Sequence, residues 1–215
     1  MGRLAVVVDF DGTAACRDVG GGLIERFAAD ASWRVIDDDY ENGRVGSRTA
    51  YRILEGILTG TEEEWVAYAR SCSELDPGLA ALARTCRERS WSLEILSDGL
   101  ELYIRPMLAS RGLDLPVRAN RAVARRKGAR IFTPHMNPLC GRCGTCKSDR
   151  VDQLAREGFR VAYVGDGYSD LCAAPKAHLL FAKSVLADHC RRRGLPFHPF
   201  ETLFDVERRL RQGAP

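Results

Sequence analysis

The 215-residue sequence has no apolar run long enough to cross a bilayer, no internal repeat and no low-complexity tract. Charge of one sign is not in excess either. The 32 Lys and Arg residues face 29 Asp and Glu, and a net charge of +3 is too small to indicate a nucleic-acid partner. The apolar run before Asp9 has only five residues, too few for a secretory leader, so we expect a cytoplasmic protein with no membrane partner. The 45% hydrophobic and 28% charged residues are typical of a globular protein.

Cysteine is abundant, with eight residues, and without a secretory leader we expect reduced thiols. Two residues separate Cys140 from Cys143 and Cys143 from Cys146, and His135 lies five residues before Cys140. Four such ligands can form a tetrahedral zinc site. Packed free thiols and a disulfide are the alternatives that this spacing leaves open.

Runs of apolar residues alternate with helical patterns along most of the chain. The Val-rich run at 4–8 predicts a buried strand, because strands covered on both faces are continuously apolar. Further strands are expected at 91–96, within 115–131 around a turn at 127–128, at 159–164 and at 178–182, and helices at 99–109, 147–157, 184–193 and 204–210. This order predicts an α/β fold with a doubly wound, Rossmann-like parallel sheet.

The stretch 16–88 has helical periodicity and no strand pattern, and Thr61 with Glu64 forms a capping box inside it. We expect this stretch to be an all-helical cap domain inserted into the sheet domain. The core domain is then formed by residues 1–15 and 89–215.

Polar residues stand where the predicted strands end. Asp9, Ser97 and Asp166 each follow a strand, and ligands bind at the carboxyl edge of such sheets. Asp11 and Asp170 lie close behind in the sequence. A cluster of carboxylates resists ionising together, and Mg²⁺ with its preference for oxygen ligands relieves that repulsion. The pattern therefore predicts a magnesium site and an anionic substrate.

Ser97 and Lys147 supply the complement to such a metal site. A hydroxyl donor and an ammonium group suit the non-bridging oxygens of a phosphoryl group. Lys147 also begins a predicted helix, where free backbone N–H groups favour an anion.

These residues carry a family resemblance. Asp9-Phe10-Asp11-Gly12-Thr13, then Ser97-Asp98-Gly99, then Lys147, then Gly165-Asp166 with Asp170, resemble the four motifs of the haloacid dehalogenase superfamily, in order. The resemblance covers the chain from the first strand to the last acidic motif.

The resemblance implies a role for each of these residues. Asp9 would be the nucleophile that forms an aspartyl-phosphate, and Asp11 the general acid and base. The phosphate would be bound by Thr13, Ser97, Asp98, Gly99 and Lys147, and Mg²⁺ by Asp9, Asp11 through its backbone carbonyl, Asp166 and Asp170. An Asp at position 11 is the mark of the phosphatases and phosphotransferases of this superfamily.

A finer resemblance concerns the substrate. The helical insertion is similar to that of the phosphoserine phosphatases. The stretches 97–108, 140–147 and 180–183 resemble the methionine-salvage phosphatases that act on 2-hydroxy-3-keto-5-methylthiopentenyl-1-phosphate. In the cap, Asp18, Arg48 and Arg52 are candidates for recognising the leaving group, with a solvated surface as the alternative for the arginines.

Together these observations predict a Mg²⁺-dependent phosphatase acting on a small phosphate monoester. Transfer of the phosphoryl group to an alcohol acceptor is one alternative. A module that binds metal and phosphate without catalysis is the other.

Overall fold

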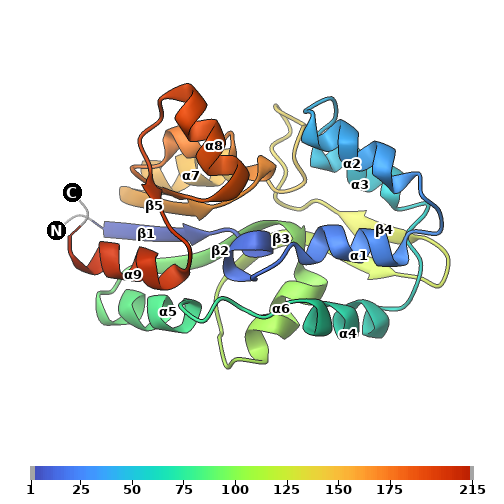
Figure 1. Cartoon of the computed structure of the whole chain (residues 1–215), viewed down its shortest axis with the longest axis horizontal. Coiled ribbons are helices and arrows are strands. Elements are labelled where there is room, and N and C mark those ends of the chain that lie inside the picture. The colour runs from blue at the N-terminus through green and yellow to red at the C-terminus, as the bar shows by residue number, and fades with distance from the viewer. Residues whose placement is uncertain (1–2, 214–215) are drawn as a thin grey trace.

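A computed structural model describes residues 3–213, so residues 1–2 and 214–215 at the two ends of the expected core domain lie outside the described residues (Figure 1). The described chain forms a sheet of seven strands in the order β4-β3-β2-β1-β5-β6-β7. The strands are β1 (Arg3–Val8), β2 (Ser92–Leu100), β3 (Val117–Ala124), β4 (Ala129–Phe132), β5 (Phe159–Gly165), β6 (Leu179–Ala182) and β7 (His198–Pro199). All neighbouring pairs are parallel except β3 with β4. The predicted doubly wound fold is confirmed.

The order of the strands reverses at β1, which lies between β2 and β5. From β1 the sheet extends through β2 and β3 on one side and through β5, β6 and β7 on the other. This reversal creates a crevice at the carboxyl ends of β1 and β5, where ligands bind in folds of this kind.

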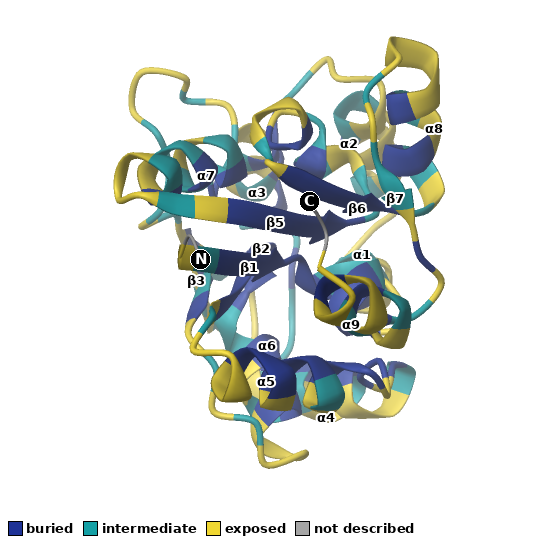
Figure 2. Cartoon of the chain, turned by 90° about the vertical axis from the view of Figure 1, so that its left-hand side faces the viewer, coloured by how far each residue is buried: buried dark blue, intermediate teal, exposed yellow. Residues whose placement is uncertain are grey.

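Helices cover both faces of the sheet, and the strands between them are buried (Figures 1 and 2). Alternate residues of β1 serve the two faces: Val6 and Val8 pack with one apolar cluster, Ala5 and Val7 with the other. The first face is covered by α5 (Leu79–Glu88), α6 (Glu101–Ala109) and α9 (Leu203–Arg211), the second by α7 (Lys147–Arg156) and α8 (Ser184–Arg193).

The remaining helices lie beyond the carboxyl edge of the sheet (Figure 1). They are α1 (Val19–Phe27), α2 (Trp33–Glu41), α3 (Ser47–Leu54) and α4 (Glu62–Cys72). The predicted capping box opens α4, because the Thr61 hydroxyl accepts the Glu64 N–H and the Glu64 carboxylate accepts the Thr61 N–H. By contrast, α5 belongs to the helices that cover the sheet, although the expected cap of residues 16–88 includes it.

The β3–β4 hairpin joins the sheet to α3. Its turn is where the sequence predicts it, and Gly128 there has a φ of +78°. The backbone carbonyl of Glu55, next to α3, accepts the Ala129 N–H at 2.7 Å, and its side chain accepts the Ile131 N–H. The hairpin therefore fixes α3 relative to the sheet. Within residues 3–213, no helix combines the length and the apolar character needed to span a membrane.

Candidate active site

The site begins where β1 and β5 end side by side. Val8 pairs with Val164 in the parallel register, so Asp9 and Asp166 leave the sheet at the same edge. The chain after Asp9 forms one irregular turn, Phe10–Ala14, in which Gly12 has a φ of +70°. A Cβ at position 12 would lie 2.3 Å from Asp166 Oδ2, so glycine is required there for space as well as for conformation.

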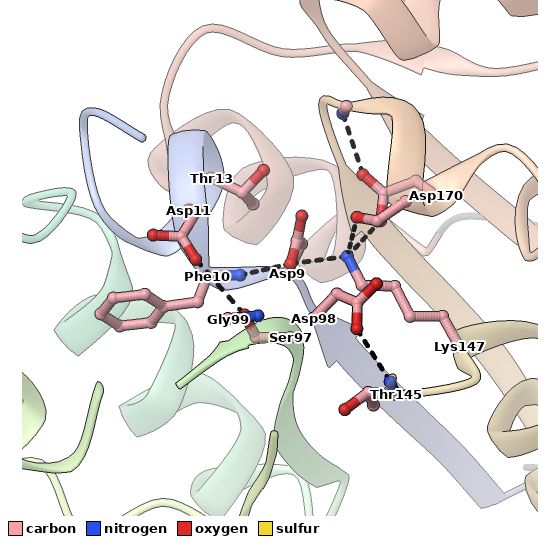
Figure 3. A network of polar contacts seen from close by, with 12 residues as sticks. Asp9, Phe10, Asp11, Thr13, Ser97, Asp98, Gly99, Thr145, Lys147 and Asp170 are labelled. Atoms are coloured by element: carbon pink, nitrogen blue, oxygen red, sulfur yellow. Dashed lines mark hydrogen bonds and ion pairs between the residues drawn. The ribbon is translucent and has the colours of Figure 1, made fainter. Parts of the chain in front are cut away.

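Three carboxylates meet at this edge. Oxygens of Asp9, Asp166 and Asp170, called here the carboxylate cluster, lie within 4.8 Å of one another. The Lys147 ammonium lies among them, with Nζ 2.7 Å from Asp9 Oδ1 and 2.7 Å from Asp170 Oδ1 (Figure 3). Nζ also donates to Ser169 Oγ at 2.6 Å. One ammonium therefore faces three buried or half-buried carboxylates, and the cluster keeps an excess of negative charge.

That excess is visible in the pKa values. Burial, followed by the charge of Asp170, raises the pKa of Asp9 well above its usual range, and Lys147 opposes the rise. Burial and Asp170 also raise the pKa of Asp166 to about 6. Burial alone would lower the pKa of Lys147, but Asp170 and Asp9 outweigh it and hold that pKa above its ordinary value. A bound cation would reduce the repulsion among these carboxylates.

The three carboxylates differ in how many protein donors they accept. Asp170 is saturated: Lys147 and the Tyr163 hydroxyl donate to Oδ1, and the N–H groups of residues 166 and 167 donate to Oδ2. Within the described part of the chain, Asp9 accepts only at Oδ1, and Asp166 accepts only at Oδ1 from Thr13. The oxygens left open to a cation are therefore Asp9 Oδ2 and Asp166 Oδ2.

Asp11 lies in the same turn as Asp9, but its carboxylate lies on the side away from Lys147 (Figure 3). Its Oδ1 accepts the N–H groups of Val19 and Gly20 at 3.1 Å each, and its Oδ2 accepts the Tyr103 hydroxyl at 2.7 Å. The Asp11 carboxylate is thus outside the carboxylate cluster, and the prediction that Asp11 binds metal can refer only to its backbone.

The environment of Asp11 suits proton transfer. Burial, followed by the charge of Asp18, raises the pKa of Asp11 to about 7, and the hydrogen bonds from Tyr103, Gly20 and Val19 oppose the rise. A carboxyl group that titrates near neutral pH can both donate and accept a proton there.

The predicted phosphate-binding residues separate into two groups. Ser97, Gly99 and Lys147 lie beside Asp9 and Asp11, with Ser97 Oγ 3.5 Å from Asp11 Oδ2 and accepting the Gly99 N–H at 2.9 Å. Thr13 is fully buried and donates to Asp166 Oδ1 at 2.7 Å, so its contact is with a carboxylate and not with a phosphate position.

Asp98 also differs from the prediction. Its Oδ1 accepts the Thr145 N–H at 2.8 Å and the Asn120 side-chain amide at 3.0 Å (Figure 3). Its Oδ2 is buried and accepts no hydrogen bond from the described residues, and burial raises the pKa of the group. These contacts make Asp98 an anchor between β3 and the loop before α7.

A cavity of about 200 Å³ lies above Asp9 and Asp11, between the sheet edge and α1 to α3. Its far wall is largely apolar and aromatic, and the wall residues are Ile24, Trp33, Ile36, Tyr40, Ala50, Tyr51 and Leu54. The acidic residues Asp18, Asp37 and Asp98 also line the cavity. No lysine, arginine or histidine occurs among the described residues that do so.

The three predicted specificity residues lie in different places. Asp18 lines the cavity, and its carboxylate also caps α1 by accepting the Gly21 N–H at 2.8 Å. Arg48 and Arg52 line a separate hollow on the other side of α3. The predicted contact of these arginines with the leaving group is therefore not supported, because α3 turns their side chains away from the catalytic cavity.

The structure does not support the zinc site, which was one of the three interpretations that the cysteine spacing left open. Among residues 3–213, the carboxylate cluster is the only group of three or more potential ligands whose ligand atoms lie within 4.8 Å, so Cys140, Cys143, Cys146 and His135 do not converge. All eight cysteines are free thiols, which also excludes the disulfide alternative in this structure. Burial raises the pKa of the Cys143 thiol to about 12.

The cysteine-rich loop instead connects the sheet to α3. Arg142 donates to the Gly43 carbonyl at 2.7 Å, and the Gly144 N–H donates to Ser47 Oγ at 3.0 Å. The loop closes on itself where the Cys146 N–H donates to the His135 carbonyl at 2.9 Å.

Sequence reasoning missed Tyr103, a fully buried residue of α6 that bonds Asp11. A Cβ at position 99 would lie 2.0 Å from the Tyr103 oxygen, which explains why glycine stands there. The spacing of Gly99 and Tyr103 across the start of α6 was the available signal, but the tyrosine by itself is indistinguishable from a core residue.

Known proteins resemble this chain over most of its length. The model of the haloacid dehalogenase-like hydrolase family matches residues 6–175. A curated relative from Geobacillus kaustophilus (strain HTA426), named 2-hydroxy-3-keto-5-methylthiopentenyl-1-phosphate phosphatase, is 30% identical over 95% of this chain and 94% of its own length. A relative of the same name from Brevibacillus brevis is 27% identical over 98% and 96%. The chain therefore belongs to the haloacid dehalogenase-like hydrolase family, and the predictions of that family and of a hydrolytic enzyme are confirmed.

Solved structures show the same fold at lower identity. A phospho-aspartyl intermediate analogue of phosphoserine phosphatase superposes with a TM-score of 0.69 at 18% identity, over 99% of both chains. A hydrolase of the same family from Salmonella enterica serovar Typhi gives 0.71 at 19% identity, over 95% of this chain and 70% of its own.

Proposed function

We propose that this family member is a Mg²⁺-dependent phosphatase that hydrolyses a small phosphate monoester through an aspartyl-phosphate on Asp9. One observation carries the proposal: a single turn presents two carboxylates to one cavity in opposite environments. Asp9 faces Lys147 and two further carboxylates, whereas Asp11 has a pKa of about 7 and faces Tyr103 and the start of α1. A nucleophile and a proton donor for the leaving group need this division.

The carboxylate cluster fits Mg²⁺, which prefers oxygen ligands and keeps positions for water and phosphate. Asp9 and Asp166 would hold the ion through their open oxygens, while Asp170 positions Lys147 and the turn after β5. When bound, Mg²⁺ would offset the negative charge of the phosphoryl oxygens and of the cluster itself.

The chain's own residues account for the remaining chemistry. An Asp9 oxygen attacks phosphorus as the bond to the ester oxygen breaks, and Asp11 gives its proton to that oxygen. Asp11, now ionised, takes a proton from a water molecule that attacks the aspartyl-phosphate. The phosphorus–Asp9 bond breaks, inorganic phosphate leaves, and both carboxyl groups return to their starting states. Ser97 and Lys147 hold the non-bridging oxygens throughout.

The cavity favours a leaving group without negative charge. Besides Asp9, Asp11 and Asp166, its lining offers three more acidic side chains and an apolar wall. Among the described residues that line it, no basic side chain could pair with a substrate carboxylate. The methylthio end of 2-hydroxy-3-keto-5-methylthiopentenyl-1-phosphate, the compound in the names of the curated relatives, fits such a wall. We therefore infer that an enol phosphate with an uncharged leaving group is preferred to phosphoserine, whose leaving group carries a carboxylate.

Helices α1 to α4 would act as the cap that selects the substrate and excludes bulk water. Because α5 packs with α9 on the sheet, we place the end of this cap before α5, near Asp76, and not at residue 88. Asp76 lies where the cap would end, and its side chain accepts the N–H groups of Gly78 and Leu203 in the core layer. The cytoplasmic location expected from the sequence remains a prediction.

A substrate panel tests the proposal. Purified protein is assayed for phosphate release from the methylthiopentenyl phosphate, phosphoserine and phosphoethanolamine, with Mg²⁺ and with EDTA. We expect turnover only with Mg²⁺ and kcat/KM at least about tenfold higher for the methylthiopentenyl phosphate than for phosphoserine. Equal or better hydrolysis of phosphoserine would contradict the substrate assignment, and no release from any ester would contradict the phosphatase.

A further inference from the structure

A second hollow lies on the far side of α3 from the catalytic cavity, between α3, α6 and the β3–β4 hairpin. Its volume is about 1040 Å³, and Tyr51 lines both hollows. Five arginines from four elements line it, and we call it the arginine groove. They are Arg48 and Arg52 of α3, Arg105 of α6, Arg121 of β3 and Arg130 of β4.

The positive charge of the groove is not balanced from within. Two carboxylates line it, and both are engaged. Glu101 is shared by Arg105 at 3.0 Å and Arg121 at 3.8 Å, and Glu55 accepts the Ile131 N–H. Five guanidinium groups against two carboxylates leave an excess of three positive charges, in a chain whose total is +3.

Three of the five arginines, Arg48, Arg52 and Arg130, form no ion pair with an acidic side chain of the described residues. The Arg130 guanidinium instead lies 5.7 Å from the centre of the Phe132 ring. Within residues 3–213, neither Arg48 nor Arg52 forms an ion pair or a side-chain hydrogen bond, although Arg48 is half-buried. They lie one helical turn apart on α3, so their guanidinium groups can face the same ligand. Phe132 adds an aromatic ring to the wall and is 47% exposed.

We propose that the arginine groove binds a small organic polyphosphate, such as a nucleoside triphosphate, at a place separate from the catalytic cavity. Guanidinium groups bind phosphate oxygens in pairs, and several of them around one hollow suit a ligand with several phosphates. The volume is that of a small-molecule site. An exposed aromatic side chain beside arginines suits a planar base. The inference does not depend on the proposed phosphatase activity, because it concerns a different surface.

Titration calorimetry tests the groove with ATP and with inorganic tripolyphosphate as probes, at about 0.15 M salt. EDTA is present, so that the metal-free carboxylate cluster repels both probes from the catalytic cavity. The test variant combines Arg48→Ala and Arg52→Ala. The matched control combines Arg192→Ala and Arg193→Ala, which remove the same charge from the exposed end of α8.

We expect the groove variant to bind both probes roughly tenfold or more weakly, and the control to bind within about twofold of the unmodified protein. Equal weakening in the two variants would show general attraction by charge and overturn the site. No binding at about 1 mM of either probe would overturn it too, as would tight binding of an oligonucleotide without binding of ATP. Because neither Arg48 nor Arg52 has an ion-pair or side-chain hydrogen-bond partner among residues 3–213, a far-ultraviolet circular dichroism melt is expected to be unchanged in the groove variant.

Discussion

Two groups of potential metal ligands stand out in the sequence, and the fold brings only one of them together among the described residues. Asp9, Asp166 and Asp170 lie up to 161 residues apart, yet their oxygens come within 4.8 Å. Cys140, Cys143 and Cys146 span only seven residues, yet with His135 they form no such group among the described residues.

The difference lies in what fixes each side chain. Asp9 and Asp166 follow adjacent parallel strands, whose separation is set by backbone hydrogen bonds at about 4.8 Å. The cysteines lie on a loop whose hydrogen bonds go to the cap through Arg142 and Gly144. A metal site is therefore predicted better by strands that end side by side than by ligands that lie close together in the sequence.

The largest expected effect comes from Asp9→Asn. The substitution keeps an oxygen that can accept from Phe10 N–H and Lys147, but it removes the nucleophile. We expect turnover of a small phosphate ester to fall by roughly 10³-fold or more, with the melting temperature retained. Steady-state phosphate release is the measurement. Asp114→Asn, in an exposed loop, is the matched control, and an active Asp9→Asn enzyme would refute covalent catalysis.

A smaller loss is expected for Tyr103→Phe. The hydroxyl holds Asp11 Oδ2 at 2.7 Å, while two backbone N–H groups continue to hold Oδ1. General acid catalysis is worth about 10²–10⁴-fold, so partial misplacement of Asp11 should slow the reaction of an alkyl phosphate by about 10- to 100-fold.

A comparison of two leaving groups shows whether Tyr103 acts on proton donation by Asp11. Aspartyl-phosphate formation from 4-nitrophenyl phosphate needs little protonation, so rapid-quench measurement should find that step slowed much less. Equal slowing of the first step for both esters would mean that Tyr103 acts through packing. Tyr68→Phe, on a half-buried helix of the cap, controls for loss of a tyrosine hydroxyl.

The sequence predicted the parts of the site that local patterns determine. The apolar runs of β1 and β5 located Asp9 and Asp166, and the topology of a parallel sheet brought them together. Tyr103 could not be found, because its partner lies 92 residues away and a buried tyrosine is commonly a core residue. The sequence could not tell which hollow Arg48 and Arg52 line, because the rotation of α3 about its axis depends on packing that the sequence does not show.

The layer in which α5 packs was beyond sequence reasoning for a related reason. The amphipathic pattern of α5 resembles that of the helices before it, and its contacts with α9 and β2 distinguish it. An apolar helix face indicates burial, but not which layer buries it.

The pH dependence of folding stability tests the charge repulsion within the carboxylate cluster. The pKa of Asp166 rises from the ordinary value of 3.8 to about 6, so the folded protein holds that proton more tightly than the unfolded chain. Stability without metal should therefore fall as the pH rises from about 4 to about 6, and remain lower above it. Asp166→Asn removes this cost and should stabilise the metal-free protein at pH 8 by about 1–2 kcal/mol.

Urea unfolding in EDTA at pH 8 and pH 5 measures this effect, and the advantage of the variant should shrink at pH 5. Mg²⁺ should stabilise the unmodified protein more than the variant. Destabilisation by Asp166→Asn at pH 8 would mean that the acceptor for Thr13 matters more than charge repulsion in the cluster.

The smallest effect is expected at the cysteines. Replacing Cys140, Cys143 and Cys146 by serine should change the free energy of unfolding by less than about 1 kcal/mol, because Cys140 is exposed and the other two are only half-buried. The loop keeps its contacts through Arg142 and the backbone of Gly144, so turnover should also be retained. Mass spectrometry under native conditions should find no zinc in the unmodified protein. The contradicting result would be zinc in the unmodified protein that the serine variant loses, together with a large fall in its stability. That result would show that the loop can rearrange around a metal, and the two ligand groups would then no longer differ.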